Sequence, residues 1–482
     1  MKLFFADYFY IDSRSLRIFR VFLSILVVYD LLVRFSDLTA HYTESGVLPA
    51  KVLMANYFNK WAWSLLILSE NSIFITSIFI VTMLAAILML FGYKIKWMVL
   101  ICWIGIVSIQ NRNPIIYQGG DDLLRMLLFW SFFLPLNKND FSSGGRVNTV
   151  ATMAILCQIL LVFLFSGIYK NSVEWWHSGS AIYFALKLDQ IARPLGISLN
   201  NYYPLTVFLT RAVYILELAV LPLFLFPFYR EHIRFFIFLF LLTFNLGIIS
   251  CMMIGIFPLC FLAASVLFIS TTCWEKIDIK LQLIKNKIST VFPPKTLNNK
   301  GLTGELNFFN NHWIIQSLLG FFFTLVLLWN TVTLPKAKLQ FPIALTPLMI
   351  ILKLDQSWGM FAPTVLKEDG WLVAKAEFYN GSVLDLFASD LPLSYAKPAS
   401  VLAKFKNDRW RKFTEQIVIT PNNKLLTQYA QFLVSNHHSY ASDNKHQIKK
   451  ITIIFMRENS RAFGQKETIE KLTLYEAYVK KI

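Results

Sequence analysis

Nine long apolar runs constrain this chain more than any other feature of its sequence. Most of them approach the roughly 17–25 residues that an α-helix needs to cross a bilayer. They predict an all-α polytopic membrane domain of about nine transmembrane helices. Eight or ten spans remain alternatives, because some runs are short or closely spaced. The runs lie near residues 16–34, 72–92, 97–112, 121–136, 150–168, 204–227, 232–250, 253–271 and 312–334.

Composition excludes the other classes of protein that a chain of this length could form. Of its 482 residues, 56% are hydrophobic and only 16% are charged, whereas a soluble domain carries about 25% charged residues. Disorder requires low hydrophobicity, which this chain lacks. Its net charge of +17 would suggest nucleic acid in a soluble protein, but in a membrane protein it indicates basic cytoplasmic loops. We therefore expect the lipid bilayer as a partner and no nucleic acid.

The distribution of basic residues predicts the orientation in the membrane. With nine spans, the N-terminal side holds fifteen lysines and arginines in its loops, and the opposite side holds six. Basic loops stay in the cytoplasm, so the N-terminus is predicted to be cytoplasmic and the C-terminal domain extracytoplasmic. The first run has no small-residue cleavage site, so it is predicted to be a retained span.

The composition of the chain changes near residues 335 and 355. These changes predict three regions: a membrane domain over 1–334, a connector over 335–354 and an extracytoplasmic domain over 355–482. The connector is apolar but contains Pro342 and Pro347. It is therefore interpreted as an interfacial or re-entrant segment. In the last region apolar runs shorten and charges become frequent, which predicts a small α+β domain.

Local patterns predict the elements of this C-terminal domain. Residues 371–378 alternate apolar and polar side chains, as a half-buried strand does. The pair Asn380-Gly381 then separates this run from a second apolar run, and Asn-Gly in that position is the strongest short-range hairpin signal. Residues 448–456 are predicted to form another strand, and residues 413–436 to be partly helical.

Cysteines and histidines predict neither a disulfide framework nor a metal centre. None of the five cysteines follows Cys273, so the C-terminal domain cannot hold an internal disulfide, and the sequence has no CxxC pair. His437 and His438 with His446 could bind a metal, but an exposed polar loop is the preferred interpretation. No phosphate-binding loop, dinucleotide fingerprint or zinc-protease motif occurs.

Ionisable residues inside apolar runs are unfavourable in lipid, so they mark functional or structural sites. Asp30 and Arg34 lie four residues apart on one helix face and are predicted to form an internal ion pair. Arg211 and Glu217 lie six residues apart and face different directions, so each is expected to meet another helix.

The densest polar cluster opens the fourth run. Carboxylates favour a helix N-terminus, so Asp121 and Asp122 are predicted to lie at the start of that helix. Asp121 and Arg125 lie four residues apart and are predicted to pair. This local interpretation does not explain the polar residues that precede them at a membrane boundary. Those residues are Asn111, Arg112 and Asn113; Tyr117 and Gln118 also belong to the cluster.

A second polar cluster follows the fifth run, where Lys170 ends an apolar helix. One interpretation is that Lys170 snorkels to the membrane surface and that Trp175 and Trp176 belong to an interfacial aromatic belt. The alternative is a desolvated lysine that is available as a base, with His177 as a proton relay. Both clusters fall on the predicted outer side, together with His41 of the first outer loop, which favours one extracytoplasmic site.

Three separated motifs occur in one order along the chain. They are His41-Tyr42 with Ser45-Gly46-Val47-Leu48-Pro49, then Asn111-Arg112-Asn113-Pro114 with Gly119-Gly120-Asp121-Asp122-Leu123-Leu124-Arg125, then Ser166-Gly167 and Lys170 with Trp175-Trp176. The set resembles the HTTM family, the membrane domain shared with vitamin K-dependent γ-glutamyl carboxylase. The segments Trp358-Gly359-Met360-Phe361-Ala362-Pro363 and Asn407-Asp408-Arg409-Trp410 are similar to the C-terminal part of longer bacterial members. The resemblance implies a location in the bacterial inner membrane.

The resemblance also implies a chemistry. The enzymatic branch of the family converts glutamate to γ-carboxyglutamate while a reduced vitamin K is oxygenated to its epoxide, which is carbon–carbon lyase and monooxygenase chemistry. A lysine starts the reaction by deprotonating the hydroquinone, and the motif puts Lys170 at that position. The carboxylase branch carries a histidine in the segment matching 111–117 and a larger, disulfide-linked outer domain; this chain has neither.

Three functions remain open from the sequence. The first is a quinol-linked enzyme that modifies an exported peptide or small substrate, with a reduced quinone as cofactor. The second is a non-catalytic scaffold or maturation partner for an exported peptide, whose outer domain offers a strand edge. The third is a transporter, against which the absence of internal repeats argues. For the enzyme, the expected catalytic residues are Lys170 and His177, and the expected ligand-binding residues are Asn111, Arg112, Asn113, Tyr117, Asp121, Asp122, Arg125, His41, Trp175 and Trp176.

Overall fold

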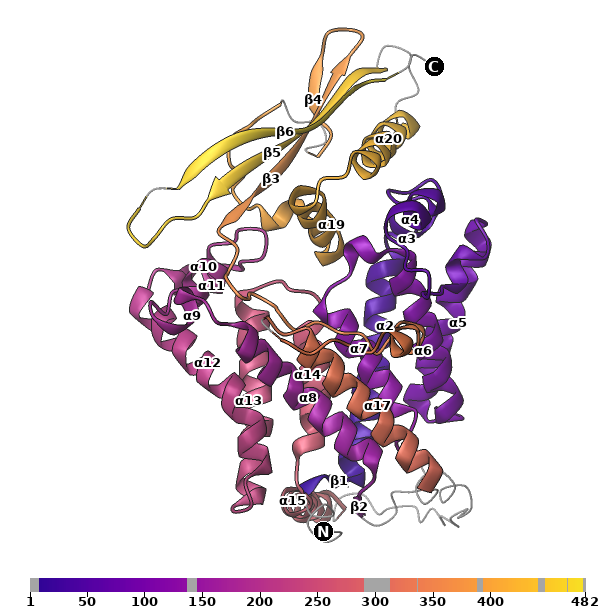
Figure 1. Ribbon diagram of the computed structural model, residues 1–482, viewed down its shortest axis with the longest axis vertical. Coiled ribbons are helices and arrows are strands. Elements are labelled where there is room, and N and C mark those ends of the chain that lie inside the picture. The colour runs from indigo at the N-terminus through magenta and orange to yellow at the C-terminus, as the bar shows by residue number, and fades with distance from the viewer. Residues whose placement is uncertain are drawn as a thin grey trace.

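The computed structural model describes residues 8–136, 145–289, 313–335, 337–387, 393–440, 447–465 and 467–479. The chain forms a helical body with a sheet and two helices at one end of it, which we call the outer domain (Figure 1). The first described residues lie at the opposite end of the body, which we call the far end.

Within the described residues, nine helices of the body coincide with the nine predicted apolar runs. They are α2 (Ser13–Phe35), α5 (Ser72–Phe91), α6 (Ile95–Arg112), α7 (Gly119–Ser131), α8 (Val150–Tyr169), α12 (Tyr203–Leu225), α13 (Arg230–Cys251), α14 (Phe257–Ser265) and α17 (Trp313–Val332).

Five of these helices are long and apolar enough to cross a membrane, among the residues that the structure describes. They are α5, α8, α12, α13 and α17; a sixth span is counted if α14 and the helix α15 (Thr271–Ser289), which meet at a bend of 87°, are taken together. The apolar helices suggest a membrane protein, and the count of nine spans stays a prediction.

Short elements connect the long helices. A two-residue pairing of β1 (Ile11–Asp12) with β2 (Arg146–Val147) lies at the far end. The predicted connector contains α18 (Thr346–Ile351). The short helices near the outer domain are α3 (Leu38–Tyr42), α4 (Ala50–Asn56), α9 (Val173–Trp176), α10 (Ala181–Leu186) and α11 (Pro194–Asn200).

Capping residues fix where several helices begin and end. Asp12 and Asn71 accept hydrogen bonds from backbone N–H groups at the start of α2 and α5, and Thr149 with Thr152 forms a capping box at the start of α8. Gly92 ends α5 with φ of +79°, a left-handed conformation that glycine adopts without strain.

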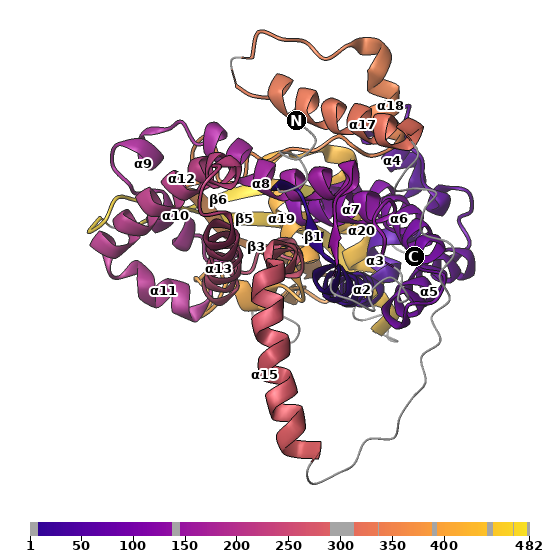
Figure 2. The same cartoon turned by 90° about the horizontal axis from the view of Figure 1, so that it is seen from below.

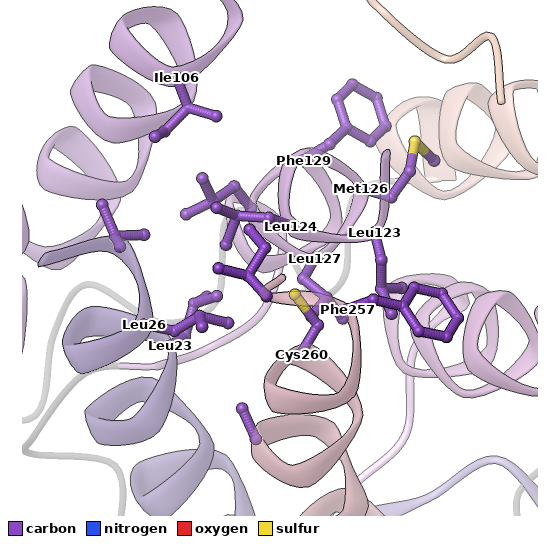
Figure 3. Close-up of a cluster of buried hydrophobic side chains, with 14 of the residues drawn as sticks. Leu23, Leu26, Ile106, Leu123, Leu124, Met126, Leu127, Phe129, Phe257 and Cys260 are labelled. Atoms are coloured by element: carbon purple, nitrogen blue, oxygen red, sulfur yellow. The ribbon is translucent and has the colours of Figure 1, made fainter. Parts of the chain in front are cut away.

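Helix α8 is the centre of the body. Of its most apolar stretch 83% is buried, against 22–33% for the corresponding stretches of α5, α12, α13 and α17. The exposed remainder of those four helices is mostly apolar, as expected of helices that face lipid. The core also contains a cluster from α2, α6, α7 and α14, which includes Leu26, Ile106, Leu124 and Cys260 (Figure 3).

The outer domain is a four-stranded antiparallel sheet in the order β4-β3-β5-β6. Its hairpin turn contains Gly381, with φ of +85°, and pairs Glu377 with Val383, so the predicted Asn-Gly hairpin is confirmed. The other predicted strand, over residues 448–456, and the helical segment are confirmed as well, whereas no sequence pattern predicts the last strand. The elements are β3 (Glu368–Phe378), β4 (Val383–Asp385), α19 (Asp408–Ile419), α20 (Asn423–Tyr440), β5 (Ile448–Asn459) and β6 (Thr468–Tyr478).

Candidate functional site

Lys170 and Glu217 form an ion pair inside the helical body. Lys170 directly follows α8, and Glu217 lies in the middle of α12. The Lys170 Nζ donates hydrogen bonds to both carboxylate oxygens of Glu217 at 2.5 Å. Each side chain is only 5% exposed. The ring of Trp175 lies 4.5 Å from the same nitrogen, so the ammonium group contacts both a carboxylate and an aromatic face.

Close packing of α8 against α12 brings the two charges together. Gly167 lies one turn before Lys170, and a Cβ at that position would come within 2.8 Å of Leu218 Cδ2. The missing side chain therefore lets α12 approach α8 at the level of the ion pair. This contact explains why a glycine lies so near the lysine in the sequence.

The ion pair lines a cavity of about 410 Å³ between α8, α12 and α13. The lining is mostly aliphatic and aromatic, and its other side-chain hydroxyls are those of Ser166 and Thr243. Thr243 and Gly247 are exposed on α13 and also line the cavity. The cavity thus reaches the outer surface of the body between two of the helices that are apolar enough to span a membrane.

Met360 and Phe361 separate this cavity from a polar cleft beside the outer domain. The Trp175 Nε1 donates to the Phe361 carbonyl at 3.0 Å, which ties this segment to the residues around Lys170. Met360 and Phe361 line both the cavity and a cleft of about 430 Å³, whose other side carries Gln118 and Arg411. Ile254 and Phe257 line both spaces as well, so these four residues form the wall between an apolar and a polar space.

Of the predicted residues after α8, only Lys170 and Trp175 line the cavity. Trp176 is exposed and packs edge-on against Tyr214, with ring centroids 4.8 Å apart. His177 is exposed as well, and its carbonyl accepts a hydrogen bond from Arg211 at 3.4 Å. The structure thus does not bring His177 to the ion pair.

Three predicted residues at the end of α6 contact the segment between α2 and α5 instead of lining the cavity. Asn111 donates to the Trp63 carbonyl at 2.7 Å, and Asn113 donates to the His41 carbonyl at 3.0 Å. Arg112 donates to the Leu48 carbonyl at 2.8 Å and pairs with a glutamate of the same segment. Their side chains satisfy backbone groups that would otherwise be buried without partners.

A buried four-charge cluster joins α2, α7 and α19. Asp30 pairs with Arg34 at 2.7 Å, as predicted. Arg409 of the outer domain pairs with Asp30 and with Asp121, each at 2.7 Å, and Arg34 also reaches Asp121. All four side chains are at most 3% exposed. We call these four residues the buried charge cluster; two carboxylates balance two guanidinium groups within it.

The predicted pairing of Asp121 with Arg125 is wrong. Asp122 pairs with Arg125 instead, and Tyr117 donates to Asp122 at 2.5 Å. The reason is rotation about the helix axis: one residue further along, the carboxylate points toward the other side of α7. Arg125 also donates to the Lys353 carbonyl at 2.8 Å, so this second group of charges holds the connector.

His41 is buried under the outer domain. Neither of its ring nitrogens has a hydrogen-bond partner in the described chain, and its ring lies 4.4 Å from that of Trp410. Burial lowers the pKa of His41 to about 3, so the imidazole is neutral at physiological pH. His41 packs the outer domain against the body and does not line the cavity beside Lys170.

Comparison of the chain with protein-family models, with curated proteins and with solved structures finds no match. Within the described residues no three histidine, cysteine or acidic side chains are grouped so that they could hold a metal. His446, a member of the possible histidine site, lies outside the described residues.

Glu217 is not among the predicted site residues, although a charge inside an apolar run indicates a functional or structural site. The sequence predicts that Glu217 meets another helix, which is confirmed, but no local pattern identifies a partner that lies 47 residues away. Met360 and Phe361 stand in a motif of the resemblance, and nothing in that motif indicates that they separate two spaces.

Asp369 of β3 should make the outer domain more stable at acidic than at neutral pH. Burial raises its pKa to about 6, above the roughly 3.9 of an unfolded chain. The folded state therefore binds the proton more tightly, and this stabilisation is complete below about pH 4 and lost as the pH rises through 6. Thermal unfolding between pH 5 and 8 should show the slope, and Asp369→Asn should reduce it; Glu458 of β5, whose pKa burial raises to about 7, contributes in the same pH range. An unchanged slope in the variant would contradict the assignment.

Proposed function

We propose that this chain is a membrane enzyme that takes a lipid-soluble hydroquinone from the bilayer and uses Lys170 with Glu217 to remove its hydroxyl proton. The observation that carries the proposal is a buried ion pair on the wall of an apolar cavity that opens between two candidate spans. The resemblance of the sequence to vitamin K-dependent carboxylase points to the same ligand.

The residues around the cavity fit a reduced quinone. Such a ligand needs an apolar surround for its ring and chain and a polar group for its hydroxyl. Phe163, Phe240 and Phe244 supply aromatic walls, and the ion pair supplies the polar group. When bound, a reduced quinone supplies electrons and a weakly acidic hydroxyl.

The geometry supports a division of labour within the ion pair. Glu217 is the basic partner, so its carboxylate oxygen is the first acceptor of the hydroxyl proton. The Lys170 ammonium, held against the Trp175 ring, then stabilises the negative charge left on the ligand oxygen. The resemblance assigns the role of base to Lys170; here the pair acts as the base, with the lysine as its cationic member.

The second substrate would approach through the polar cleft. Met360 and Phe361, together with Ile254 and Phe257, line both the cleft and the cavity, so a group that passes between these side chains reaches the ion pair. An exported peptide or a small extracytoplasmic substrate suits a space lined by Gln118, Gln190 and Arg411. The choice of an exported substrate rests on the resemblance, and it requires the outer domain to lie outside the cytoplasm.

Exposed aromatic residues support a membrane around the body. Trp176 and Tyr202 are exposed toward the outer-domain end, and Tyr93, Trp97 and Tyr229 are exposed toward the far end. Tryptophan and tyrosine gather at the two membrane–water interfaces. In the proposed orientation the far end is cytoplasmic and the membrane is the bacterial inner membrane.

A second candidate function is a scaffold for an exported peptide. The observation that favours it is strand β6, an edge strand of eleven residues whose side chains are mostly exposed and which has no neighbour on its outer side among the described strands. Such an edge can accept a peptide as an added strand. A scaffold would need the outer domain and would tolerate loss of the ion pair.

Filling the cavity tests the enzyme proposal. A Cβ at Gly247 meets nothing within 4 Å, so Gly247→Leu should place its side chain in the cavity without disturbing the fold. Losing the contacts of two ligand methylenes is worth about 1.6 kcal/mol, on the order of tenfold in affinity. Organic extraction and mass spectrometry of the purified protein should therefore show a quinone in the wild type and at least about tenfold less in Gly247→Leu.

Gly320→Leu is the matched control. A Cβ at Gly320 also meets nothing within 4 Å, but this glycine lies on α17 and does not line the cavity. The variant should retain the quinone at the level of the wild type. Bulk phospholipid alone in all three proteins would overturn the quinol proposal.

A further inference from the structure

Helix α15 leaves the body sideways at the far end. It meets the α14 segment at a bend of 87°. In Figure 1 it is seen nearly end-on below the other helices, and in Figure 2 it stands well away from the body. If the apolar helices cross the membrane along the long axis of the molecule, α15 lies parallel to the membrane plane.

The first turns of α15 are fixed to α2. The Trp274 Nε1 donates to the Ser15 Oγ at 2.8 Å, and Asp278 pairs with Arg14. The guanidinium of Arg14 lies 5.8 Å from the Trp274 ring centre. These contacts set the depth and direction in which the helix starts, so its sideways course is built into the fold.

Away from this attachment, α15 exposes two lysines beside Ile277. Lys276 and Lys280 are exposed and lie one turn apart on one face. Ile277, on the flank of this face, is 37% exposed, whereas Ile279 lies one turn after Glu275 on the opposite side of the helix. The sequence continues the pattern, since the apolar positions 273, 277, 281, 284 and 288 recur at helical spacing and Lys285 and Lys287 follow.

We propose that α15 lies in the headgroup layer of the membrane at the far end, where its lysines bind the phosphates of anionic phospholipids and the apolar stripe that contains Ile277 enters the acyl-chain boundary. Charge complementarity selects this occupant, because a basic amphipathic helix parallel to the membrane meets anionic headgroups first. The far end carries the exposed Lys94 as well. This role is independent of the reaction at Lys170.

Spin labels on α15 test its position. In a background with Cys251→Ser and Cys273→Ser, the labels would replace Ile277 or Glu275 of the full chain in lipid nanodiscs. With 30% phosphatidylglycerol in phosphatidylcholine, the label at 277 should be accessible to oxygen and shielded from a water-soluble nickel complex. The label at 275, on the far side of the helix, should show the reverse.

Charge variants test the headgroup contact. Each lysine at an anionic surface contributes roughly fivefold to binding, so Lys276→Gln with Lys280→Gln should lower the ratio of membrane-bound to water-exposed label about fivefold for each lysine. Lys424→Gln with Lys449→Gln, two exposed lysines of the outer domain, is the matched control and should change nothing. Pure phosphatidylcholine should reproduce the effect of the α15 variants.

Three results would overturn the proposal. Equal nickel accessibility at 277 and 275 would put α15 in water. Shielding of both labels from oxygen and nickel would mean that protein covers the helix. If the label stayed bound to the membrane to the same extent in pure phosphatidylcholine and in the α15 lysine variants, headgroup binding would be excluded.

Discussion

Arg409→Met is expected to destabilise the protein by about 3–5 kcal/mol, the usual effect of breaking a buried ion pair. The substitution leaves Asp30 and Asp121, both buried, with Arg34 as their one remaining partner in the buried charge cluster. It also removes the charge by which α19 of the outer domain is held to α2 and α7. Thermal unfolding in detergent, followed separately in the outer domain and the body, measures the effect.

Arg457→Met is the matched control. Arg457 also pairs with two glutamates, but on the exposed face of the sheet. Exposed pairs contribute little to stability, so this variant should unfold like the wild type. If Arg409→Met unfolded at the wild-type temperature, the buried charge cluster would not hold the outer domain to the body.

Removing the ion pair of the cavity in steps should separate its structural role from its chemical role. Lys170→Met leaves Glu217 buried without a counter-charge, and Glu217→Met leaves Lys170 in the same state. Each single variant should lose about 3–5 kcal/mol, whereas the double variant should be close to the wild type in stability, because a pair replaced by apolar groups is often neutral. Thermal unfolding of the three variants measures this part.

The affinity for the hydroquinone should not follow the stability of the three variants. A hydrogen bond to a charged group contributes about 1.5–3 kcal/mol, roughly tenfold to a hundredfold in affinity. All three variants should therefore lose the quinone that extraction and mass spectrometry detect in the wild type. A double variant that is stable and still retains the ligand would show that the pair only packs α8 against α12, and would favour the scaffold.

Much of the fold could be predicted from the sequence because its signals are local. Apolar runs indicate nine helices of the body in the described part of the chain, and the Asn-Gly pair indicates the hairpin of the outer domain, since both depend on neighbouring residues. The same holds for Asp30 and Arg34, which pair within one helix turn. Strand β6 could not be predicted, because its side chains are mostly exposed and do not alternate between buried and exposed positions.

The candidate site depends on contacts that no local pattern specifies. Arg409 meets Asp30 from 379 residues away, and Lys170 meets Glu217 across 47 residues. Helical spacing favours Arg125 as the partner of Asp121, but tertiary packing brings two arginines from other elements to that carboxylate. His177 follows Lys170 closely in the sequence, yet the short helix α9 turns it outward.

The buried charge cluster has a consequence for biosynthesis. Three of its members lie in the first 121 residues, and Arg409 follows Asp121 by 288 residues. At the usual speed of a ribosome this separation lasts on the order of tens of seconds. Until the last member is made, two carboxylates share a single guanidinium, and the early helices must keep water or a proton beside them. A chain cut short before residue 409 would retain this uncompensated charge in its interior, so a truncated product differs physically from a complete one at a point far from the cut.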